Sequence, residues 1–455
     1  MRTLAILAFA LGCTGETPQT PTEPTDAGPI TCKDVERTNC FEIAAGDVKT
    51  LQDTVNLLED DSAIVLEAGT YAFDNALTVR NANGVTIIGQ GIDQTVLDFN
   101  AVQAQTNGVD VIADDIVLEG FTVVDAKKDG VRVEDSNGVV FRKVKVTWSG
   151  GPLTTNGAYG LYPVKVTNVL MEDSEAYNAS DAGIYVGQCV NAIIRNNIAM
   201  GNVAGIEIEN TQYADVYGNL AEDNTAGLIM FDLPGNPVIG RDVRIHDNRI
   251  INNNRENFAP GGTVSVIPAG TGTLALASRR SEIDNNTYEN NQTTDVALLS
   301  GFVINGDPAA WHILNEDLVG DTDDLGLISD ETGVFNYRSE NIWVHDNTHS
   351  NSGGNPDDAD FVAREIGFLL GVVYGEEPVD AVWYDAIGES SFSATDAAGN
   401  SNDNNMCIGV ATGMTFASLN LEELIDTPSL ENVYRPEPPF APFDCEGTRP
   451  IAPEF

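Results

Sequence analysis

Glu207 and Glu209 are the acidic pair whose type and spacing best fit catalytic chemistry. They alternate with Ile206 and Ile208, so on a β-strand both carboxylates share one face, about 6–7 Å apart. Two carboxyl groups roughly 6.5–9.5 Å apart can act as the acid and the base of an inverting glycoside hydrolase. Solvated charges on strands often have the same spacing, and this simpler interpretation stays open.

Aromatic residues precede this pair at similar intervals. Tyr162 lies 23 residues before Tyr185, and Tyr185 lies 22 residues before Glu207. Tyrosine rings are apolar platforms with a polar tip, which suits them to packing against sugar rings. Arg132 could pair with a carboxylate of the substrate. The predicted substrate-binding residues are Arg132, Tyr159, Tyr162, Tyr185 and Phe231.

Carboxylates around the same strands also fit the oxygen ligands that Ca²⁺ prefers. Asp181 and Asp232, together with Glu207 and Glu209, form a candidate calcium site. A bound ion there would bridge to an anionic sugar and acidify its C-5 proton for a lyase reaction. Three interpretations of this face therefore remain: an acid–base pair, a calcium site, or charges on a surface that binds a ligand without reacting or has no ligand.

The elements that position these residues belong to a repeat of 22 residues. Gly183-Ile184-Tyr185-Val186 is followed 22 residues later by Gly205-Ile206-Glu207-Ile208. A period of about twenty residues with short apolar alternations is typical of a β-solenoid. One interval is 30 residues long, which predicts a loop at residues 150–157. The glycines that begin equivalent strands are Gly108, Gly130, Gly160, Gly183, Gly205 and Gly227.

Side chains in each predicted strand alternate between the interior of the coil and its outer face. The first and third positions after the glycine are apolar, which places them inside. The position between them should face outward, and coils about 4.8 Å apart should stack Tyr162, Tyr185 and Glu207 in one column. The predicted interior residues are Val109, Val111, Val131, Val133, Leu161, Pro163, Ile184, Val186, Ile206, Ile208, Leu228 and Met230.

Asparagines recur one coil apart in the predicted turns. Such residues should stack as amide ladders that donate and accept hydrogen bonds along the solenoid axis, which is a structural role. His246 and His345 occur in similar His-Asp-Asn settings and are interpreted as turn residues before metal ligands. The predicted ladder residues are Asn197, Asn219 and Asn248 in one row and Asn202, Asn224 and Asn253 in the other.

Both ends of the coil series show distinct patterns. Residues 50–59 have apolar residues at helical spacing and predict a short helix that covers the first coil. Residues 252–262 predict a second long loop on the same side as the first, after which residues 263–267 should resume the strands.

The N-terminus reads as an export signal. Residues 1–13 contain one arginine and an apolar run too short to span a bilayer. Cys13 after a small residue is typical of the bacterial lipoprotein signal, in which the cysteine carries the lipid; ordinary secretion is the alternative. Residues 14–31 are rich in Thr and Pro and predict a tether.

Cysteines outside the signal fit an oxidising compartment. Cys32, Cys40, Cys407 and Cys445 allow three pairings, of which Cys32 with Cys40 and Cys407 with Cys445 are the short-range ones. Cys189 is left over and is predicted to be a buried, unreactive thiol.

Charge excludes several classes of function. Asp and Glu outnumber Lys and Arg by 69 to 23, which gives a net charge of −46. This field repels nucleic acid and anionic membranes. The sequence also has no Walker loop and no dinucleotide fingerprint.

These patterns resemble a known architecture. The Gly-led, Asn-rich coils and the helix-strand-Gly-Thr-Tyr entry resemble the right-handed parallel β-helix of the pectate-lyase-like superfamily. Residues 156–235, with Asp181-Ala182-Gly183 and Phe231-Asp232-Leu233-Pro234-Gly235, resemble more closely an uncharacterised family of exported bacterial β-helix-repeat lipoproteins. The resemblance implies an all-β fold and a surface that binds, cleaves or epimerises acidic polysaccharides.

One motif is similar to that of bacterial mannuronan C-5 epimerases. The run Tyr159-Gly160-Leu161-Tyr162-Pro163-Val164 resembles their Tyr-Gly-Phe-Asp-Pro-His motif. Tyr159 is kept, but Tyr162 stands for Asp, Val164 for His, and Gly187 falls where a second Asp is expected. The resemblance therefore implies that epimerase proton transfer is lost, because a lone Tyr lacks neighbours that shift its pKa.

The chain divides into five predicted parts. Residues 1–13 are the signal, 14–31 the tether, 32–83 the N-terminal cap and first strands, and 84–305 the coils. Residues 306–455 hold irregular terminal coils, a helical insertion and a tail tied by a disulfide.

The predicted function is that of an exported cell-envelope protein that binds, and in one interpretation processes, a polysaccharide on its outer strand face. It would be lipid-anchored at the outer membrane or in the periplasm, or secreted, and would meet a membrane only through its lipid. One alternative is a calcium-assisted lyase, glycoside hydrolase or epimerase-like enzyme acting on an acidic glycan. The other is a non-enzymatic scaffold that docks another envelope protein.

Overall fold

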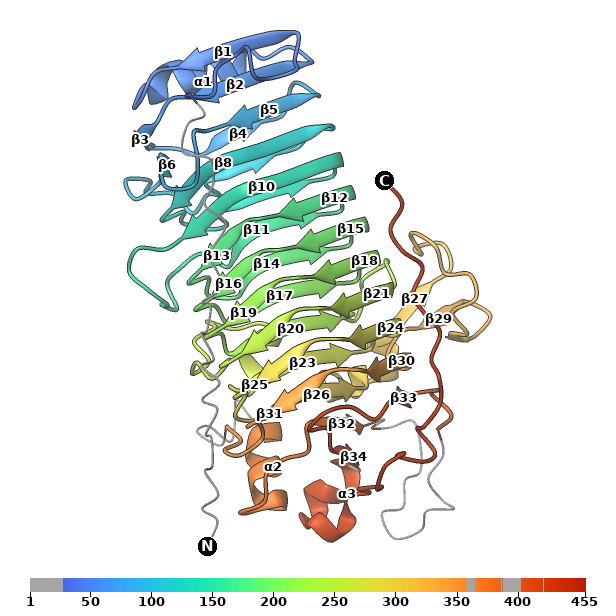
Figure 1. Ribbon diagram of the computed structural model, residues 1–455. Coiled ribbons are helices and arrows are strands. Elements are labelled where there is room, and N and C mark those ends of the chain that lie inside the picture. The colour runs from blue at the N-terminus through green and yellow to red at the C-terminus, as the bar shows by residue number, and fades with distance from the viewer. Residues whose placement is uncertain (1–27, 358–364, 386, 388–401, 420) are drawn as a thin grey trace, which may run out of the picture.

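The computed structural model describes residues 28–357, 365–385, 387, 402–419 and 421–455. The chain winds into a parallel β-helix whose coils stack from β1 (Asn39–Ile43) at one end to β34 (Phe416–Ser418) at the other (Figure 1). Successive coils pair in register, with Ile184 opposite Ile206 and Ile206 opposite Leu228. The 22-residue period is therefore one coil, as predicted.

One face of the solenoid is an eleven-stranded sheet, which we call the first sheet. It contains most of the Gly-led strands of the sequence repeat and carries the predicted site. Its last strand is β34. The other ten are β4 (Leu77–Val79), β7 (Val109–Val111), β9 (Val131–Glu134), β11 (Tyr159–Val164), β14 (Ala182–Gly187), β17 (Ala204–Glu209), β20 (Ala226–Phe231), β23 (Thr271–Leu276), β26 (Thr294–Leu299) and β32 (Val382–Asp385).

Twenty strands form the second and third faces. They make one sheet because β8 (Ile116–Val124) and β10 (Asn137–Thr147) run round the corner and pair on both faces. The second face continues with β2 (Ser62–Leu66), β5 (Val85–Ile88), β12 (Thr167–Glu172), β15 (Val190–Arg195), β18 (Gln212–Tyr217), β21 (Arg241–His246), β24 (Arg279–Asp284), β30 (Glu340–His345) and β33 (Cys407–Ile408). The third has β3 (Gly69–Ala72), β6 (Thr95–Asp98), β13 (Glu175–Tyr177), β16 (Ile198–Met200), β19 (Leu220–Glu222), β22 (Arg249–Ile251), β25 (Thr287–Glu289) and β31 (Thr348–Ser350).

The interior of the solenoid is the main hydrophobic core. Every predicted interior residue is buried, and Met230, at 2% exposure, is the most exposed of those in the core. The alternation along each strand therefore assigned the two faces correctly.

Asparagine ladders line two corners of this core. Asn197 donates through Nδ2 to Oδ1 of Asn219 at 3.0 Å, and Asn219 donates likewise to Asn248 at 2.9 Å. The second row runs in the same way from Asn202 to Asn224 at 3.0 Å. Both predicted rows are confirmed and extend further, through Asn286 and Asn347 in the first and Asn291 in the second.

The first coil is covered by α1 (Val48–Asn56), close to the predicted helix. Asp47 caps it by accepting a hydrogen bond from the backbone N–H of Thr50 at 3.0 Å. Leu51 and Val55 on its inner side are buried against the core. The helix thus shields the open end of the solenoid, as predicted.

Insertions cover the C-terminal part of the first sheet. Residues 252–270, which we call the roof loop, contain a 3-10 helix at Thr263–Val266, so the prediction of a strand at residues 263–267 is wrong. The turn begins at Gly262, whose φ of 84° favours glycine. Other insertions are 3-10 helices at Gly301–Val303 and Pro308–Trp311, α2 (Glu365–Tyr374), α3 (Leu421–Asp426), a 3-10 helix at Leu430–Asn432 and a small sheet of β27 (His312–Leu314), β28 (Ile328–Ser329) and β29 (Gly333–Phe335).

Two disulfides link Cys32 to Cys40 and Cys407 to Cys445, the predicted short-range pairs, and Cys189 is buried and free. After Cys445 the tail runs back along the second face (Figure 1). Within the described residues, no helix is long and apolar enough to cross a membrane. Cys13, the signal and the tether up to residue 27 lie outside the described residues.

Candidate functional site

The predicted column of side chains exists on the outside of the first sheet. Arg132 of β9 pairs with Tyr162 of β11, and Tyr185 of β14 pairs with Glu207 of β17. The ring centroids of Tyr162 and Tyr185 are 4.8 Å apart. These four side chains therefore form one row across four coils.

Tyr159 joins this row and completes an aromatic cluster. Its ring centroid is 4.6 Å from that of Tyr162 and 4.5 Å from that of Tyr185. The Tyr185 ring lies over Gly187, where an added Cβ would be 2.3 Å from the ring atom Cε1. An aspartate at position 187, as the epimerase pattern requires, is therefore sterically excluded while Tyr185 holds this position.

The expectation that the whole column lies open to solvent is wrong. Tyr185 is 5% exposed, Glu207 1% and Phe231 4%. The roof loop approaches this region: an added Cβ at Gly262 would lie 4.0 Å from Asp181 Oδ2, and Phe258 packs in the same hydrophobic cluster as Tyr185 and Phe231. Only Tyr159, Tyr162, Asp181 and Arg132 stay partly exposed.

Arg132 is already neutralised by the protein. Its guanidinium lies 2.8 Å from Asp110 and 2.9 Å from Glu134. Burial lowers the pKa of Arg132, but the hydrogen bond to Asp110 and the negative charges of Asp110, Glu134 and Asp129 together outweigh it, so the net shift is upward. Because Arg132 already pairs with two carboxylates, it is poorly placed to form an ion pair with a substrate carboxylate.

Glu207 is a buried acid without a partner. Its Oε1 atom is shielded from solvent and accepts no hydrogen bond from the described residues. Burial raises the pKa of Glu207 well above its usual range, and repulsion from Asp181 and Glu209 raises it further. A buried titratable group of this kind beside an aromatic cluster is a hallmark of functional sites.

Asp181 and Glu209 lie on either side of Glu207. Burial, reinforced by the negative charge of Glu209, raises the pKa of Asp181 to about 7, although a hydrogen bond with Tyr159 opposes the rise. Burial likewise raises the pKa of Glu209 to about 7, although hydrogen bonds with Tyr185 and Gln188 oppose it. Asp181 and Glu209 can thus exchange protons near neutral pH.

Asp232 belongs to a different network. It accepts hydrogen bonds from the backbone N–H of Gly240 at 2.9 Å and from Asn336 at 2.9 Å, and Arg279 lies 3.4 Å away. Asp181, Glu207, Glu209 and Asp232 contain no trio whose ligand atoms all lie within 4.8 Å of one another. Calcium binding by these four would require the carboxylates to move, and it stays a prediction that titration with Ca²⁺ would test.

Asp129 is a site residue that the sequence reading missed. It is 1% exposed, and burial raises its pKa to about 6, although Lys128, 3.7 Å away, opposes this rise. Its charge acts on the neighbouring Tyr162, whose pKa is raised mainly by burial. The available signal was its place directly before Gly130, since Asp181 stands similarly just before Gly183.

A groove adjoins the carboxyl groups at the edge of the first sheet. It has a volume of about 620 Å³ and is lined by Lys165, Gln188, Glu209, Leu233 and Val319, among others. Gln188 donates a hydrogen bond to Glu209 Oε1 at 2.8 Å, which fixes that carboxyl at the wall. A ligand in this groove would contact Glu209 directly.

Beyond β20 the first sheet carries no comparable site. Its outward residues, such as Ile229, Leu276 and Trp383, face the roof loop and α2 across an apolar cavity of about 50 Å³. The cavity walls expose almost no polar atoms, so this part of the face is a second hydrophobic core. The tyrosine–carboxyl site, defined as Tyr159, Tyr162, Tyr185, Asp181, Glu207 and Glu209, therefore ends at β17, and the apolar cavity begins at β20.

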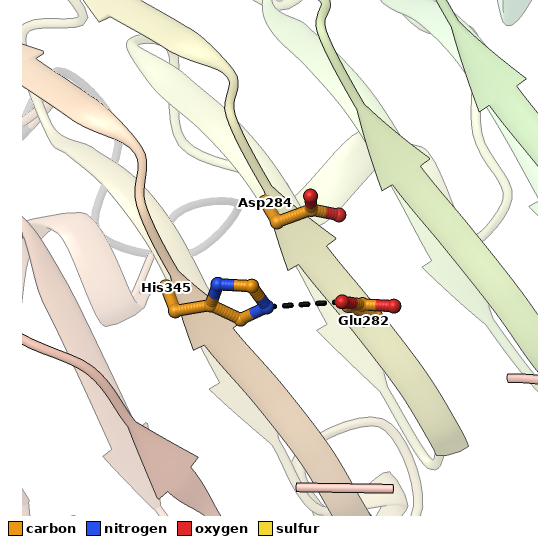
Figure 2. A group of neighbouring side chains, drawn as sticks. All are labelled: Glu282, Asp284 and His345. Carbon is orange, nitrogen blue, oxygen red and sulfur yellow. Dashed lines mark hydrogen bonds and ion pairs between the residues drawn. The ribbon is translucent and has the colours of Figure 1, made fainter. Parts of the chain in front are cut away.

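A separate cluster on the second face has the composition of a metal site. Glu282, Asp284 and His345 are the only such trio within 4.8 Å among the described residues, and Figure 2 shows His345 pointing at Glu282, 3.0 Å away. Arg244 forms two hydrogen bonds with Asp284, at 2.9 and 2.7 Å, and its Nε lies 3.3 Å from Glu282. Arg449 from the C-terminal tail lies 3.8 Å from Glu282. Two guanidinium groups beside the trio make it an ion-pair network under the tail.

The two histidines end strands instead of lying in turns. His345 and His246 are the last residues of β30 and β21, and each bonds through Nδ1 to the following aspartate, Asp346 or Asp247. The prediction of turn residues is wrong by one position, because the turn begins at the aspartate, whose φ is 52° in both cases.

Comparisons with known proteins agree with this architecture. No curated protein sequence matches the chain. Among solved structures it is similar to the A-module of the mannuronan C-5 epimerase AlgE4 of Azotobacter vinelandii (15% identity, 77% of this chain and 93% of that chain, TM-score 0.44). It is also similar to pectate lyase Pel9A (14%, 69% and 96%, 0.39) and to PfbA, a surface adhesin of Streptococcus pneumoniae (12%, 59% and 81%, 0.39). Similarity at this level carries no argument about activity.

A match to a family of sequences is more extensive. The model of the right handed beta helix region matches residues 75–241 and 129–355. Together these stretches cover more than half of the 455 residues. The chain belongs to the family of right-handed parallel β-helix proteins.

Proposed function

We propose that this protein binds a polysaccharide at the tyrosine–carboxyl site. The observation that carries the proposal is the cluster of Tyr159, Tyr162 and Tyr185, with ring centroids 4.5–4.8 Å apart, beside the buried Glu207 and Glu209 and the partly exposed Asp181. Tyr159 and Tyr162 are partly exposed and can pack against a sugar ring. The carboxyl groups can accept hydrogen bonds from the sugar hydroxyls when ionised and donate to them when protonated. The groove at Glu209 extends the surface along the sheet edge.

Export to the cell envelope is part of this proposal. Two disulfides fit an oxidising compartment, which in bacteria lies outside the cytoplasm. A lipid on Cys13 would hold the solenoid at the membrane surface, in the outer membrane or the periplasm. Metabolic labelling with a radioactive fatty acid, compared with Cys13→Ser, tests the anchor directly.

Processing of the bound glycan is a second candidate function. Because Asp181 and Glu209 have pKa values of about 7, each can hold a proton near neutral pH and give it to a leaving sugar oxygen as a general acid. Release of reducing ends, or of unsaturated uronates with and without Ca²⁺, would reveal this activity. A protein that only docks an envelope partner would bind no glycan and would be recovered with that partner in a pull-down.

Loss of Tyr162 should weaken glycan binding. We expect Tyr162→Ala to lower the affinity for the retained polysaccharide about fivefold, since loss of an aromatic contact costs on the order of 1 kcal/mol. Affinity electrophoresis across a panel of polysaccharides measures the change. Tyr177→Ala is the matched control, because Tyr177 is partly exposed on β13 of the third face. Equal retention of both variants, or no retention of the unaltered protein on any polysaccharide, contradicts the proposal.

A further inference from the structure

The charges around the tyrosine–carboxyl site are unbalanced. Of the nearby basic groups, Arg132 is held by Asp110 and Glu134, and Lys128 and Lys165 lie 3.7 Å from Asp129 and 3.8 Å from Glu134. Within the described part of the chain, no Lys, Arg or His lies within 4.0 Å of the carboxyl groups of Asp181, Glu207 and Glu209. Lys165 lines the groove beside Glu209 without pairing with it, so among the described residues none of the three acids has a counterion within 4.0 Å.

An acidic polysaccharide fits this site poorly. Asp181 and Glu209, where they are ionised, would repel a uronate, and the net charge of −46 adds to the repulsion at longer range. No base that the structure describes contacts these two acids, and the nearest pairs of Lys128 and Lys165 are with Asp129 and Glu134. This changes the expectation of an acidic glycan that the fold resemblance implies.

An ammonium group has the complementary chemistry. It offers three donors and one positive charge, and the site offers unpaired carboxyls with the electron-rich faces of tyrosine rings. Glu207 Oε1, buried and without a hydrogen bond, leaves uncompensated negative potential directly behind the accessible groups. Asp181, partly exposed and bonded to Tyr159, is the acid that a sugar substituent can reach.

We infer that the polysaccharide bound here carries free amino groups, as a polymer of glucosamine does, and that the ammonium binds at Asp181 with Glu207 and Glu209 behind it. The inference rests on the proposed function and names the class of glycan that the site selects. A neutral N-acetylated polymer would keep the ring contacts with Tyr159 and Tyr162 and lose the ion pair.

Proton release should accompany this binding. The groups that face Asp181 and Glu209 are Asp129, Glu207, Asp232 and the three tyrosines, all acids. On the roof loop, Arg255 is paired with Asp223, and Glu256 is exposed. An ammonium ion stabilises the ionised carboxylates, so below about pH 7 they must release protons as it binds. Affinity should rise toward neutral pH and fall again above about pH 8, where amino groups lose their charge.

The test compares three oligosaccharides of equal length, made of glucosamine, N-acetylglucosamine or galacturonic acid. Isothermal titration calorimetry near neutral pH should show at least about tenfold tighter binding of the glucosamine oligomer than of the N-acetylated one, and the weakest binding for the galacturonate oligomer. Repeating the titration in two buffers of different ionisation heat measures the protons released.

A protein with a net charge of −46 attracts any polycation. The variant Asp181→Asn therefore distinguishes binding of the ammonium group at Asp181 from this non-specific attraction. We expect this variant to reduce the preference for the amino sugar over the N-acetylated oligomer to about twofold, because the ion pair is lost while the ring contacts remain for both oligomers. Glu289→Gln on the third face removes one partly exposed carboxylate elsewhere and should preserve the preference. A preference that survives Asp181→Asn, or equal affinity for the amino and N-acetylated oligomers, overturns the inference while glycan binding stands. No binding of any oligomer or any polysaccharide of the panel overturns the proposed function as well.

Discussion

Replacing Asn219 with Leu should destabilise the solenoid by about 3–6 kcal/mol. Asn219 Oδ1 accepts from the backbone N–H and the Nδ2 of Asn197, at 2.9 and 3.0 Å, and its own Nδ2 donates to the carbonyl of Ile194 and to Asn248, both at 2.9 Å. Asn219 is 2% exposed, so water cannot replace these bonds. Each buried polar group left without a partner costs about 1–3 kcal/mol. Leucine removes four hydrogen bonds: the backbone N–H of Asn197 and the Ile194 carbonyl lose the Asn219 side chain, while Asn197 Nδ2 keeps the Met171 carbonyl and Asn248 Oδ1 keeps the backbone N–H of residue 219.

The measurement is the midpoint and slope of urea unfolding. Asn75 is the control position, because it is exposed and Asn75→Leu should change the free energy of unfolding by less than about 0.5 kcal/mol. If Asn219→Leu lowers the free energy of unfolding no more than Asn75→Leu does, the asparagine ladder does not stabilise the coils.

The second large effect is a pH-dependent gain of stability in Asp181→Asn. The pKa of Asp181 rises from its usual 3.8 to about 7 on folding, so between these values the folded state binds a proton that the unfolded chain has lost. The contribution of Asp181 is fully favourable below about pH 4 and is lost as the pH rises through 7. At about 1.4 kcal/mol per pH unit, the free energy of unfolding falls by on the order of 4 kcal/mol over this range. The variant keeps this stability, because asparagine does not titrate.

Unfolding curves of the variant and the unaltered protein should therefore coincide near pH 4 and separate by pH 8, with the variant more stable. Asp135→Asn is the matched change at an exposed turn and should follow the unaltered protein at both values. A variant that is less stable at pH 8 would show that the Asp181 carboxylate is held by favourable contacts, and that the site is not short of positive charge.

The spacing of a few residues was enough to predict the architecture. Interior residues such as Ile184 and Ile206 repeat every 22 residues, and because parallel coils stack in register, the same spacing placed Tyr162, Tyr185 and Glu207 in one row. The asparagine rows followed from the same argument, since amides at equivalent places in successive turns lie one coil apart and can bond to one another. Local periodicity determines these features because each coil contacts mainly its two neighbours.

The burial of the site could not be predicted from the spacing of the repeat. Tyr185 and Glu207 are buried in the region that the roof loop approaches, and Phe258 and Ala259 of this loop come from a later coil. Arg132 is neutralised by Asp110 one coil earlier and by Glu134 on its own strand. Irregular loops have no period, so nothing in the repeat indicates where they fold.

The sequence by itself determined the solenoid and the column of outward side chains, because these depend on periodicity. Only the tertiary structure decided which of those side chains are buried and which charges remain unpaired. The physical reason is that desolvation and pairing depend on every group within a few ångströms. At this site those groups come from three or more coils and from the loop that approaches them.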